Sequence, residues 1–320
     1  MPPNVSHWKH IPAVPTVAFK EFDLTSLPQI SRTAVFHSSG TTEQEPSRHF
    51  HSAESLAVYE ASLLPWFHAR VMPHLESQIS NLMLAFLTPP PSRVPQSSLI
   101  HMFETVRRGF GAADSPFVGR VAPDGGWGLD PDATLGILHE ASAAKRPLAL
   151  LGTAFSFVHL LDHLADKRVR FELPAGSRAM ETGGYKGRSR SLPKTELHAL
   201  ITQRLGIPPK RIVCEYGMSE LSSQAYDWEV QSSESRVQGP ARVFHFPPWA
   251  RVQFISPETG SEVAEGETGL IRVCDLANVF SVMAIQTEDL GIRRGNGFEL
   301  AGRAERAEAR GCSLMSVESA

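Results

Sequence analysis

Residues 81–216 alternate short apolar runs with longer amphipathic stretches, and this alternation constrains the fold more than any other feature of the chain. Each short run predicts a strand, and each longer stretch predicts a helix. The predicted strands are 81–87, 116–121, 148–151, 179–182 and 211–214, and the predicted helices are 97–108, 130–145, 153–165 and 192–205. Strands that alternate with helices form βαβ units, so we expect an α/β fold with largely parallel sheets flanked by helices.

The pattern changes after about residue 240. Turn residues such as Pro257 and Gly260 now separate short predicted strands, which are 243–246, 251–255, 269–274 and 282–286. This spacing indicates a small antiparallel or barrel-like β subdomain. We therefore expect an α/β core over residues 1–240, a β-rich subdomain of that core over 241–301, and a residual hinge segment over 302–320.

A cluster of small hydroxyl residues follows a predicted strand at 34–37 and precedes a predicted helix at 52–64. A glycine lets the backbone approach a ligand closely, and hydroxyl and N–H groups bind phosphate oxygens. The Gly-Lys-Ser/Thr ending of a P-loop is absent, so the cluster alone fits a surface turn equally well. The candidate phosphate-binding residues are Ser38, Ser39, Gly40, Thr41, Thr42 and Arg48.

Two later motifs carry further candidates for binding. Tyr216 follows a predicted strand and offers a flat ring for stacking on a base, and Glu220 offers a carboxylate to a hard cation such as Mg²⁺. Asp289 is able to accept two hydrogen bonds from the hydroxyl groups of a ribose. Each of these residues, taken singly, is explained as well by a turn or a core position.

In their order along the chain, the motifs resemble those of the adenylate-forming, or AMP-dependent, ligases. Within that superfamily the chain is most similar to the LuxE-like acyl-protein synthetases of bacterial bioluminescence. The residues that carry the resemblance are 38–42 with 46–48, 181–187, 216–220, 289, 302–303 and 310–313. The resemblance implies ATP-dependent activation of a carboxylic, fatty acid as an acyl-adenylate, with ATP and Mg²⁺ as cofactors.

The resemblance also implies a role for individual residues. Thr41, Thr42 and Arg48 would hold the phosphates, and Glu220 would hold Mg²⁺. The adenine would stack on Tyr216 and lie against Gly183 and Gly184. Asp289 would hold the ribose, and Arg303 would bridge ribose or phosphate. Thr153, Phe155 and Phe157 would line the acyl pocket, although phenylalanines at such positions are also typical of a core.

The chain departs from the common ligases near its end, since it stops eight residues after Cys312. Common ligases continue there into a lid domain with a catalytic lysine, so we expect the C-terminal lid domain to be absent. The resemblance implies an acyl thioester on Cys312 and delivery of the acyl group to a partner acyl reductase. Arg306 and Arg310 lie close in sequence, where their charge would favour a thiolate. An inert cysteine in a frayed terminus is the alternative.

Two other functions stay open at this point. The acyl group would in one case pass to a diffusible amine, thiol or carrier protein. In the other case the chain would be an inactive homologue that binds a partner, which the replacement of usual motif residues by Glu43 and Glu305 favours.

Composition narrows the kinds of partner that we expect. Lys and Arg number 31 against 34 Asp and Glu, a near-neutral balance that argues against bulk nucleic-acid binding. Three cysteines do not suggest a disulfide framework. The chain has neither an N-terminal signal nor an apolar run long enough for a membrane span, so the cytoplasm is the expected location. The short segment before residue 38 leaves a homo-oligomer open.

Overall fold

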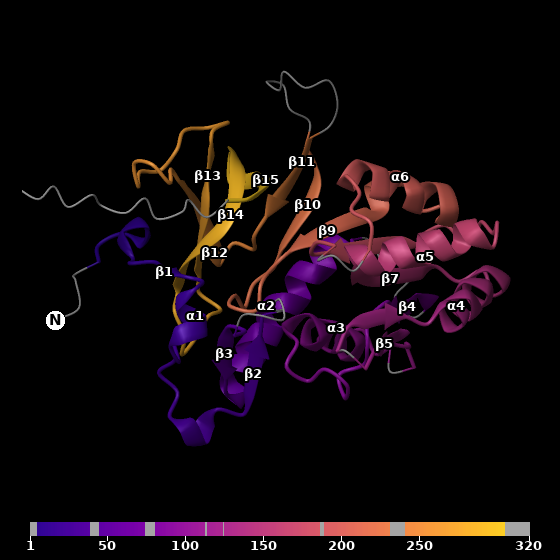
Figure 1. Cartoon of the computed structure of the whole chain (residues 1–320), viewed down its shortest axis with the longest axis horizontal. Coiled ribbons are helices and arrows are strands. Elements are labelled where there is room, and N and C mark those ends of the chain that lie inside the picture. Colours follow the sequence, from indigo (N-terminus) through magenta and orange to yellow (C-terminus); the bar gives the residue numbers. More distant parts are fainter. Residues whose placement is uncertain are drawn as a thin grey trace, which may run out of the picture.

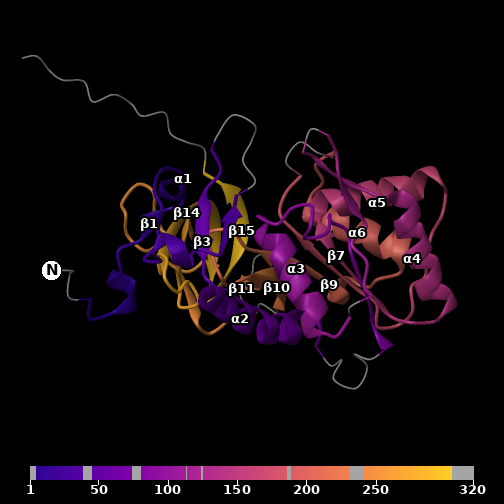
Figure 2. The same cartoon turned by 90° about the horizontal axis from the view of Figure 1, so that it is seen from below.

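One eleven-stranded sheet organises the chain, as shown in Figure 1. The computed structural model describes residues 5–38, 45–73, 81–112, 114–123, 125–185, 189–230 and 241–304. Ten strands follow one another in the order β12-β13-β14-β15-β11-β10-β9-β8-β7-β4, and β1 (Val14–Pro15) pairs with β14. Figure 2 shows the two halves of this sheet side by side, one covered by helices and one largely of strands.

The parallel half comprises β4, β7, β8 and β9, which are the predicted strands of the α/β core. Their bounds are Met83–Phe86, Leu148–Thr153, Arg178–Thr182 and Ile212–Tyr216. α2 (Ala53–Val71) and α3 (Ser98–Gly109) pack on one face of these strands. The other face is covered by α4 (Pro131–Ala143), α5 (Ala154–Asp166) and α6 (Lys194–Leu205). The predicted helices and strands of this half are therefore confirmed.

The antiparallel half begins at β10, directly beside β9. Its strands are β10 (Ala225–Val230), β11 (Ala241–His245), β12 (Ala250–Ile255), β13 (Thr268–Asp275), β14 (Ala284–Arg294) and β15 (Gly297–Arg303). The sequence analysis missed β10 and β15. The predicted fold class, a parallel α/β part followed by an antiparallel β part, is confirmed, and hydrogen bonds between β9 and β10 make the two parts one sheet. The division at residue 240 stays a prediction.

Two predicted strands lie outside the main sheet. β2 (Ala34–His37) pairs only with β3 (Arg48–His51), in an antiparallel hairpin. The predicted strand at 34–37 and the predicted helix that begins near residue 52 are confirmed, whereas the second strand of the hairpin, β3, was not predicted. β5 (Gly119–Val121) likewise forms its own small antiparallel sheet with β6 (Trp127–Leu129).

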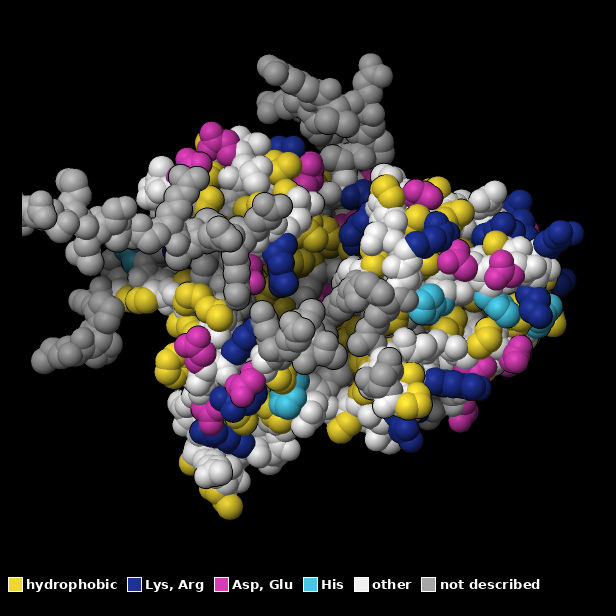
Figure 3. Space-filling model, in the orientation of Figure 1, with side chains coloured by type: hydrophobic (Ala, Val, Ile, Leu, Met, Phe, Trp, Pro, Cys, Tyr) yellow, Lys and Arg dark blue, Asp and Glu magenta, His cyan; other side chains and the backbone are white. Residues whose placement is uncertain are grey.

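Short helices complete the described part of the chain. They are η1 (Trp8–His10), α1 (Ala18–Glu21), η2 (Gln29–Ser31) and η4 (Pro209–Arg211). No helix of the described residues is long and apolar enough to span a bilayer. Figure 3 shows basic and acidic side chains interspersed over the helical half of one face, in agreement with the near-neutral net charge.

Candidate functional site

The carboxyl ends of three parallel strands form the floor of the candidate site. The register of the sheet places Thr153 of β7 beside Thr182 of β8, and Thr182 beside Glu215 of β9. Ligands of parallel α/β sheets bind beyond these strand ends. Gly183 follows at φ +70°, and neither it nor Gly184 would bring a Cβ within contact of another residue. Among the described residues, no neighbour therefore crowds the backbone of Gly183 and Gly184.

The β2–β3 hairpin meets the turn that follows β9. Ser38 Oγ accepts a hydrogen bond from the Ser47 N–H at 3.0 Å, which closes the base of the loop that contains the predicted phosphate-binding residues. Ser47 Oγ lies 3.4 Å from Ser219 Oγ, and the Ser219 hydroxyl donates to Glu220 Oε2 at 3.0 Å. The structure thus brings the first motif and Glu220 together. Ser39, Gly40, Thr41 and Thr42 lie outside the described residues.

Arg48 begins β3 at this junction. A terminal nitrogen of Arg48 pairs with Asp23 at 3.1 Å, whereas its Nε is buried and has no hydrogen-bond partner in the described part of the chain. A buried donor without a partner is costly, and an oxyanion would satisfy it. The position of Arg48 is therefore compatible with the predicted contact to a phosphate.

His49 ties the hairpin to the Glu220 turn, and the sequence analysis missed it. Its Nδ1 lies 2.9 Å from the carbonyl oxygen of Ser219, so Nδ1 carries the proton and donates. Burial lowers the pKa of His49 to about 4, although the Ser219 carbonyl opposes the shift. The ring is neutral at pH 7 in this arrangement. No spacing signal in the sequence relates residue 49 to residue 219.

Tyr216, Asp289 and Arg303 come together from three different strands. The Tyr216 hydroxyl donates to Asp289 Oδ2 at 2.9 Å, and Arg303 Nε donates to Asp289 Oδ1 at 3.3 Å. The Tyr216 ring is only 7% exposed, and Phe244, Phe246 and Phe298 contact it edge-on. Burial and the neighbouring Asp289 carboxylate raise the pKa of Tyr216 well above its ordinary value. The structure thus joins two widely separated sequence motifs at one carboxylate.

A buried aspartate shapes the turn that carries Glu220, and the sequence analysis missed this residue as well. Asp275 accepts hydrogen bonds from the N–H groups of Ser222 and Ser223, at 3.1 and 2.8 Å. Asn278 Nδ2 donates to the Glu220 carbonyl at 2.8 Å. Burial raises the pKa of Asp275 against the effect of these hydrogen bonds. β13 therefore positions Glu220 from the antiparallel half of the sheet.

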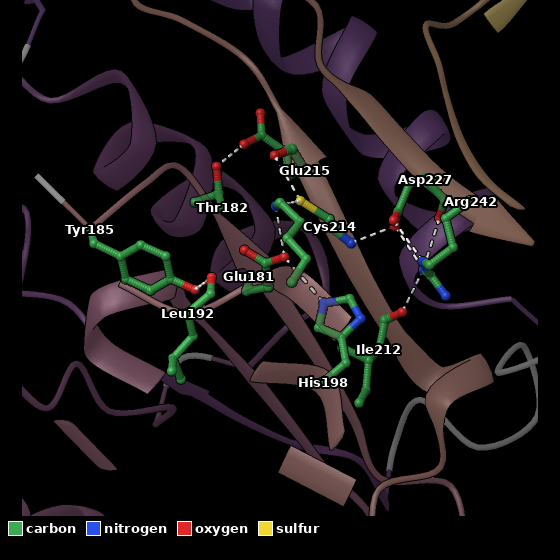
Figure 4. A network of polar contacts seen from close by, with 11 residues as sticks. Glu181, Thr182, Tyr185, Leu192, His198, Ile212, Cys214, Glu215, Asp227 and Arg242 are labelled. Carbon is green, nitrogen blue, oxygen red and sulfur yellow. Dashed lines mark hydrogen bonds and ion pairs between the residues drawn. The ribbon is translucent and has the colours of Figure 1, made fainter. Parts of the chain in front are cut away.

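A polar network lies beneath the site in the parallel half (Figure 4). Glu181 is completely buried and accepts hydrogen bonds from Lys194 Nζ at 2.9 Å and His198 Nε2 at 3.2 Å. Burial opposes ionisation, but Lys194 and His198 outweigh it and lower the pKa of Glu181 to about 2. Lys194 also contacts the thiol of Cys214, which is free and buried.

Glu215 lies beside this network, and its pKa is shifted in the opposite direction to that of Glu181. It accepts a hydrogen bond from the Thr182 hydroxyl, and a Cβ at Gly217 would overlap its carboxyl group. Burial raises the pKa of Glu215 to about 7, while Thr182 and Lys194 oppose the shift. Two neighbouring glutamates with pKa values pushed apart are typical of functional sites.

The three residues predicted for the acyl pocket lie at the start of α5. Thr153 caps this helix, and its side chain accepts a hydrogen bond from the Ser156 N–H at 3.2 Å. Phe155 is 5% exposed and contacts His159, whereas Phe157 is fully buried in the core between the sheet and α4–α6. Phe157 is therefore a core residue, which was the alternative to a role in the acyl pocket. Cys312 lies outside the described residues.

Comparison with known proteins decides the family. The family described as acyl-protein synthetase, LuxE, matches residues 128–319, which is more than half of the chain. The chain belongs to the LuxE acyl-protein synthetase family. Its match to this family covers β6 through β15 and continues past the described residues.

Individual relatives of this LuxE family member are distant. The long-chain-fatty-acid–luciferin-component ligase of Aliivibrio fischeri is 24% identical over 198 residues, which are 58% of this chain and 49% of that protein. The chain therefore spans about half the length of this curated relative.

Solved structures of adenylate-forming ligases share the fold. ATP-bound MatB from Rhodopseudomonas palustris has a TM-score of 0.55 at 18% identity, over 84% of this chain and 48% of that one. A long-chain-fatty-acid-CoA ligase, FadD1 from Archaeoglobus fulgidus, has a TM-score of 0.54 at 15% identity, over 84% of this chain and 51% of that one. At these identities the likeness shows the fold alone.

Proposed function

We propose that this LuxE family member activates a fatty acid with ATP and passes the acyl group to its own Cys312. The observation that carries the proposal is the meeting of Tyr216, Arg303 and Asp289 beside the Glu220 turn, at the carboxyl ends of the parallel strands. Side chains from separate motifs converge there although they are far apart in sequence. The names of the fatty-acid ligases among its relatives support the substrate class.

The residues present fit ATP and Mg²⁺. Arg48 has a buried Nε for an oxyanion, Gly183 and Gly184 leave the backbone open, and Asp289 presents a carboxylate to hydroxyl groups. Glu220 supplies an oxygen ligand of the kind that Mg²⁺ prefers. When bound, Mg²⁺ would neutralise charge on the phosphates. The protein residues themselves would position the reactants and exclude water.

The proposed reaction has two steps. In the first, a carboxylate oxygen of the acid attacks the α-phosphorus of ATP, the bond to the bridging oxygen breaks, and pyrophosphate leaves. In the second, the Cys312 thiolate attacks the acyl carbon, and AMP leaves with the electron pair of the C–O bond. The thioester would then be delivered to a partner acyl reductase.

Acid-dependent exchange between pyrophosphate and ATP tests the first step. We expect exchange that requires Mg²⁺ and responds to the chain length of the added fatty acid. A complete lack of exchange with every acid would favour a binding function without catalysis.

Replacement of Cys312 by serine tests the second step. Cys312→Ser should retain pyrophosphate exchange but lose hydroxylamine-sensitive labelling by a radioactive acyl chain, because a serine hydroxyl without an adjacent base is a poor nucleophile at neutral pH. Cys274→Ala, at a buried thiol of β13, is the matched control and should still be labelled. Normal labelling of Cys312→Ser would refute the role of Cys312. Loss of labelling in Cys274→Ala as well would show that the assay reports on folding.

A further inference from the structure

A second hollow is lined by none of the residues predicted to bind the nucleotide or the acyl group, although Phe246 in its wall contacts Tyr216. This cavity of about 580 Å³ lies between α2, the strands β10–β12 and the N-terminal helix η1. Three of the five tryptophans of the chain line it, namely Trp8, Trp66 and Trp228. Its size is in the range of pockets that hold small molecules.

An arginine packed against two indole rings forms part of the wall of this cavity. The Arg70 guanidinium carbon lies 4.3 Å from the ring centroid of Trp66 and 4.0 Å from that of Trp228. His245 stacks on Trp228 with 3.9 Å between centroids. Arg70 Nε and Trp66 Nε1 are both buried without a hydrogen-bond partner among the described residues. These two donors lie in the wall of the cavity and lack an acceptor among the described residues, which is uncommon for buried polar groups.

The charges around the cavity favour an anion. Arg251 lies over the Trp8 ring at 5.4 Å, and in the described part of the chain neither Arg251 nor Arg70 forms an ion pair. Glu262 is the one acidic residue of the lining, and it is already paired with Lys9 and Arg293. Burial lowers the pKa of Arg70, as expected for a cation that lacks a counter-ion.

The remaining walls are apolar. Phe246, Pro247, Val252 and Phe254 line the side of the cavity that faces β11 and β12. A ligand that satisfies Arg70 and also covers these walls needs an anionic head and an apolar body. We propose that this cavity binds a small amphiphile with one oxyanion head group, carboxylate or phosphate, whose head contacts Arg70 and whose body contacts Phe246 and Phe254. The proposal is independent of the function proposed above.

Titration of the full chain without ATP tests the proposal. Dodecanoate, dodecyl phosphate and dodecanol share one apolar body and differ in the head group. Tryptophan fluorescence should report saturable binding, and calorimetry should give one Arg70-dependent site per chain, apart from any site that takes dodecanoate as the substrate acid. We expect at least one of the two anions to bind about tenfold more tightly than dodecanol, and the tighter anion identifies the head group. Equal binding of all three, or no saturable binding, would overturn the proposal.

Three variants locate the site by calorimetry. Arg70→Met keeps an unbranched apolar side chain, and it should weaken binding of the preferred anion about tenfold to a hundredfold without changing dodecanol binding. Arg251→Met, at the rim of the cavity, should cause a smaller loss of affinity for the anion. It provides the test of the site if Arg70→Met does not fold. Arg93→Met, at an exposed arginine beside a different hollow near β5, should bind as the wild type. Wild-type affinity in both cavity variants would refute the assignment. Pyrophosphate exchange plays no part in these measurements, so the two proposals fail separately.

Discussion

The two halves of the sheet contribute to the candidate site in different ways. In the parallel half, β7, β8 and β9 are buried along their whole length, and their charged residues Arg178, Glu181 and Glu215 form hydrogen bonds within the protein. In the antiparallel half, Asp289 and Arg303 form their ion pair near the surface, with the Arg303 side chain 71% exposed. The parallel half therefore couples the site to stability, whereas the Asp289–Arg303 pair of the antiparallel half is accessible to a ligand at little structural cost.

The largest effect should follow from Glu181→Gln in the parallel half. Loss of this buried negative charge leaves the Lys194 ammonium without its counter-ion and should lower the free energy of unfolding by roughly 3–4 kcal/mol. This is the lower part of the range for buried pairs, because the Lys194 side chain is 41% exposed. Urea denaturation measures this change in the free energy of unfolding. Glu196→Gln, on the exposed side of α6, should change stability by less than about 0.5 kcal/mol.

The pH dependence of stability should report Glu215. Its folded-state pKa of about 7 exceeds the ordinary value of 4.5, so the folded protein holds a proton that the unfolded chain loses. The stabilisation is complete below about pH 4.5 and is lost as the pH rises to about 7, up to about 3 kcal/mol in total. Glu215→Gln stays neutral and should flatten this part of the stability profile. An unchanged slope in the variant would assign the pH dependence to other groups.

A smaller effect on binding, without a comparable effect on stability, is expected in the antiparallel half. Asp289→Ala should weaken ATP binding by about 2 kcal/mol, or about thirtyfold, because a charged acceptor for hydroxyl groups is lost. Calorimetric titration with ATP measures this change. Glu299→Ala removes an ion-paired carboxylate from β15 in the same half and should bind ATP normally. Equal losses in both variants would indicate a general disturbance of this half.

The smallest expected effect is that of replacing Thr153 at the start of α5. This replacement tests whether Thr153 serves only the stability of the fold or also the binding of the fatty acid. Thr153→Ala removes a helix cap and should lower stability by about 1 kcal/mol. Ser97→Ala removes the equivalent cap of α3 and should cost a similar amount. If Thr153 also lines the acyl pocket, only Thr153→Ala should raise the KM for the fatty acid in pyrophosphate exchange. Identical kinetics in the two variants would restrict Thr153 to its structural role.

The parallel half was predictable because its signals are local. Apolar runs, helix caps such as Asp130 and the alternation of elements depend on neighbouring residues, and the structure confirms the strands and helices that they predict. β10 and β15 were missed because a strand with polar or glycine positions has no continuous apolar run. The hairpin of β2 and β3 was missed for another reason, since pairing between strands is not encoded in either strand alone.

The sequence by itself determined which residue types are available for the chemistry and their order along the chain. It also determined the fold class, because hydrophobic periodicity and helix caps are short-range properties. Only the tertiary structure decided that Asp289 accepts from both Tyr216 and Arg303, that Asp275 holds the Glu220 turn, and that Arg70 packs against Trp228 while forming no ion pair with the residues that the structure describes. Most of these contacts join residues more than fifty positions apart, the exception being Asp289 with Arg303. Their geometry depends on strand order and burial, which are set by the packing of the whole sheet.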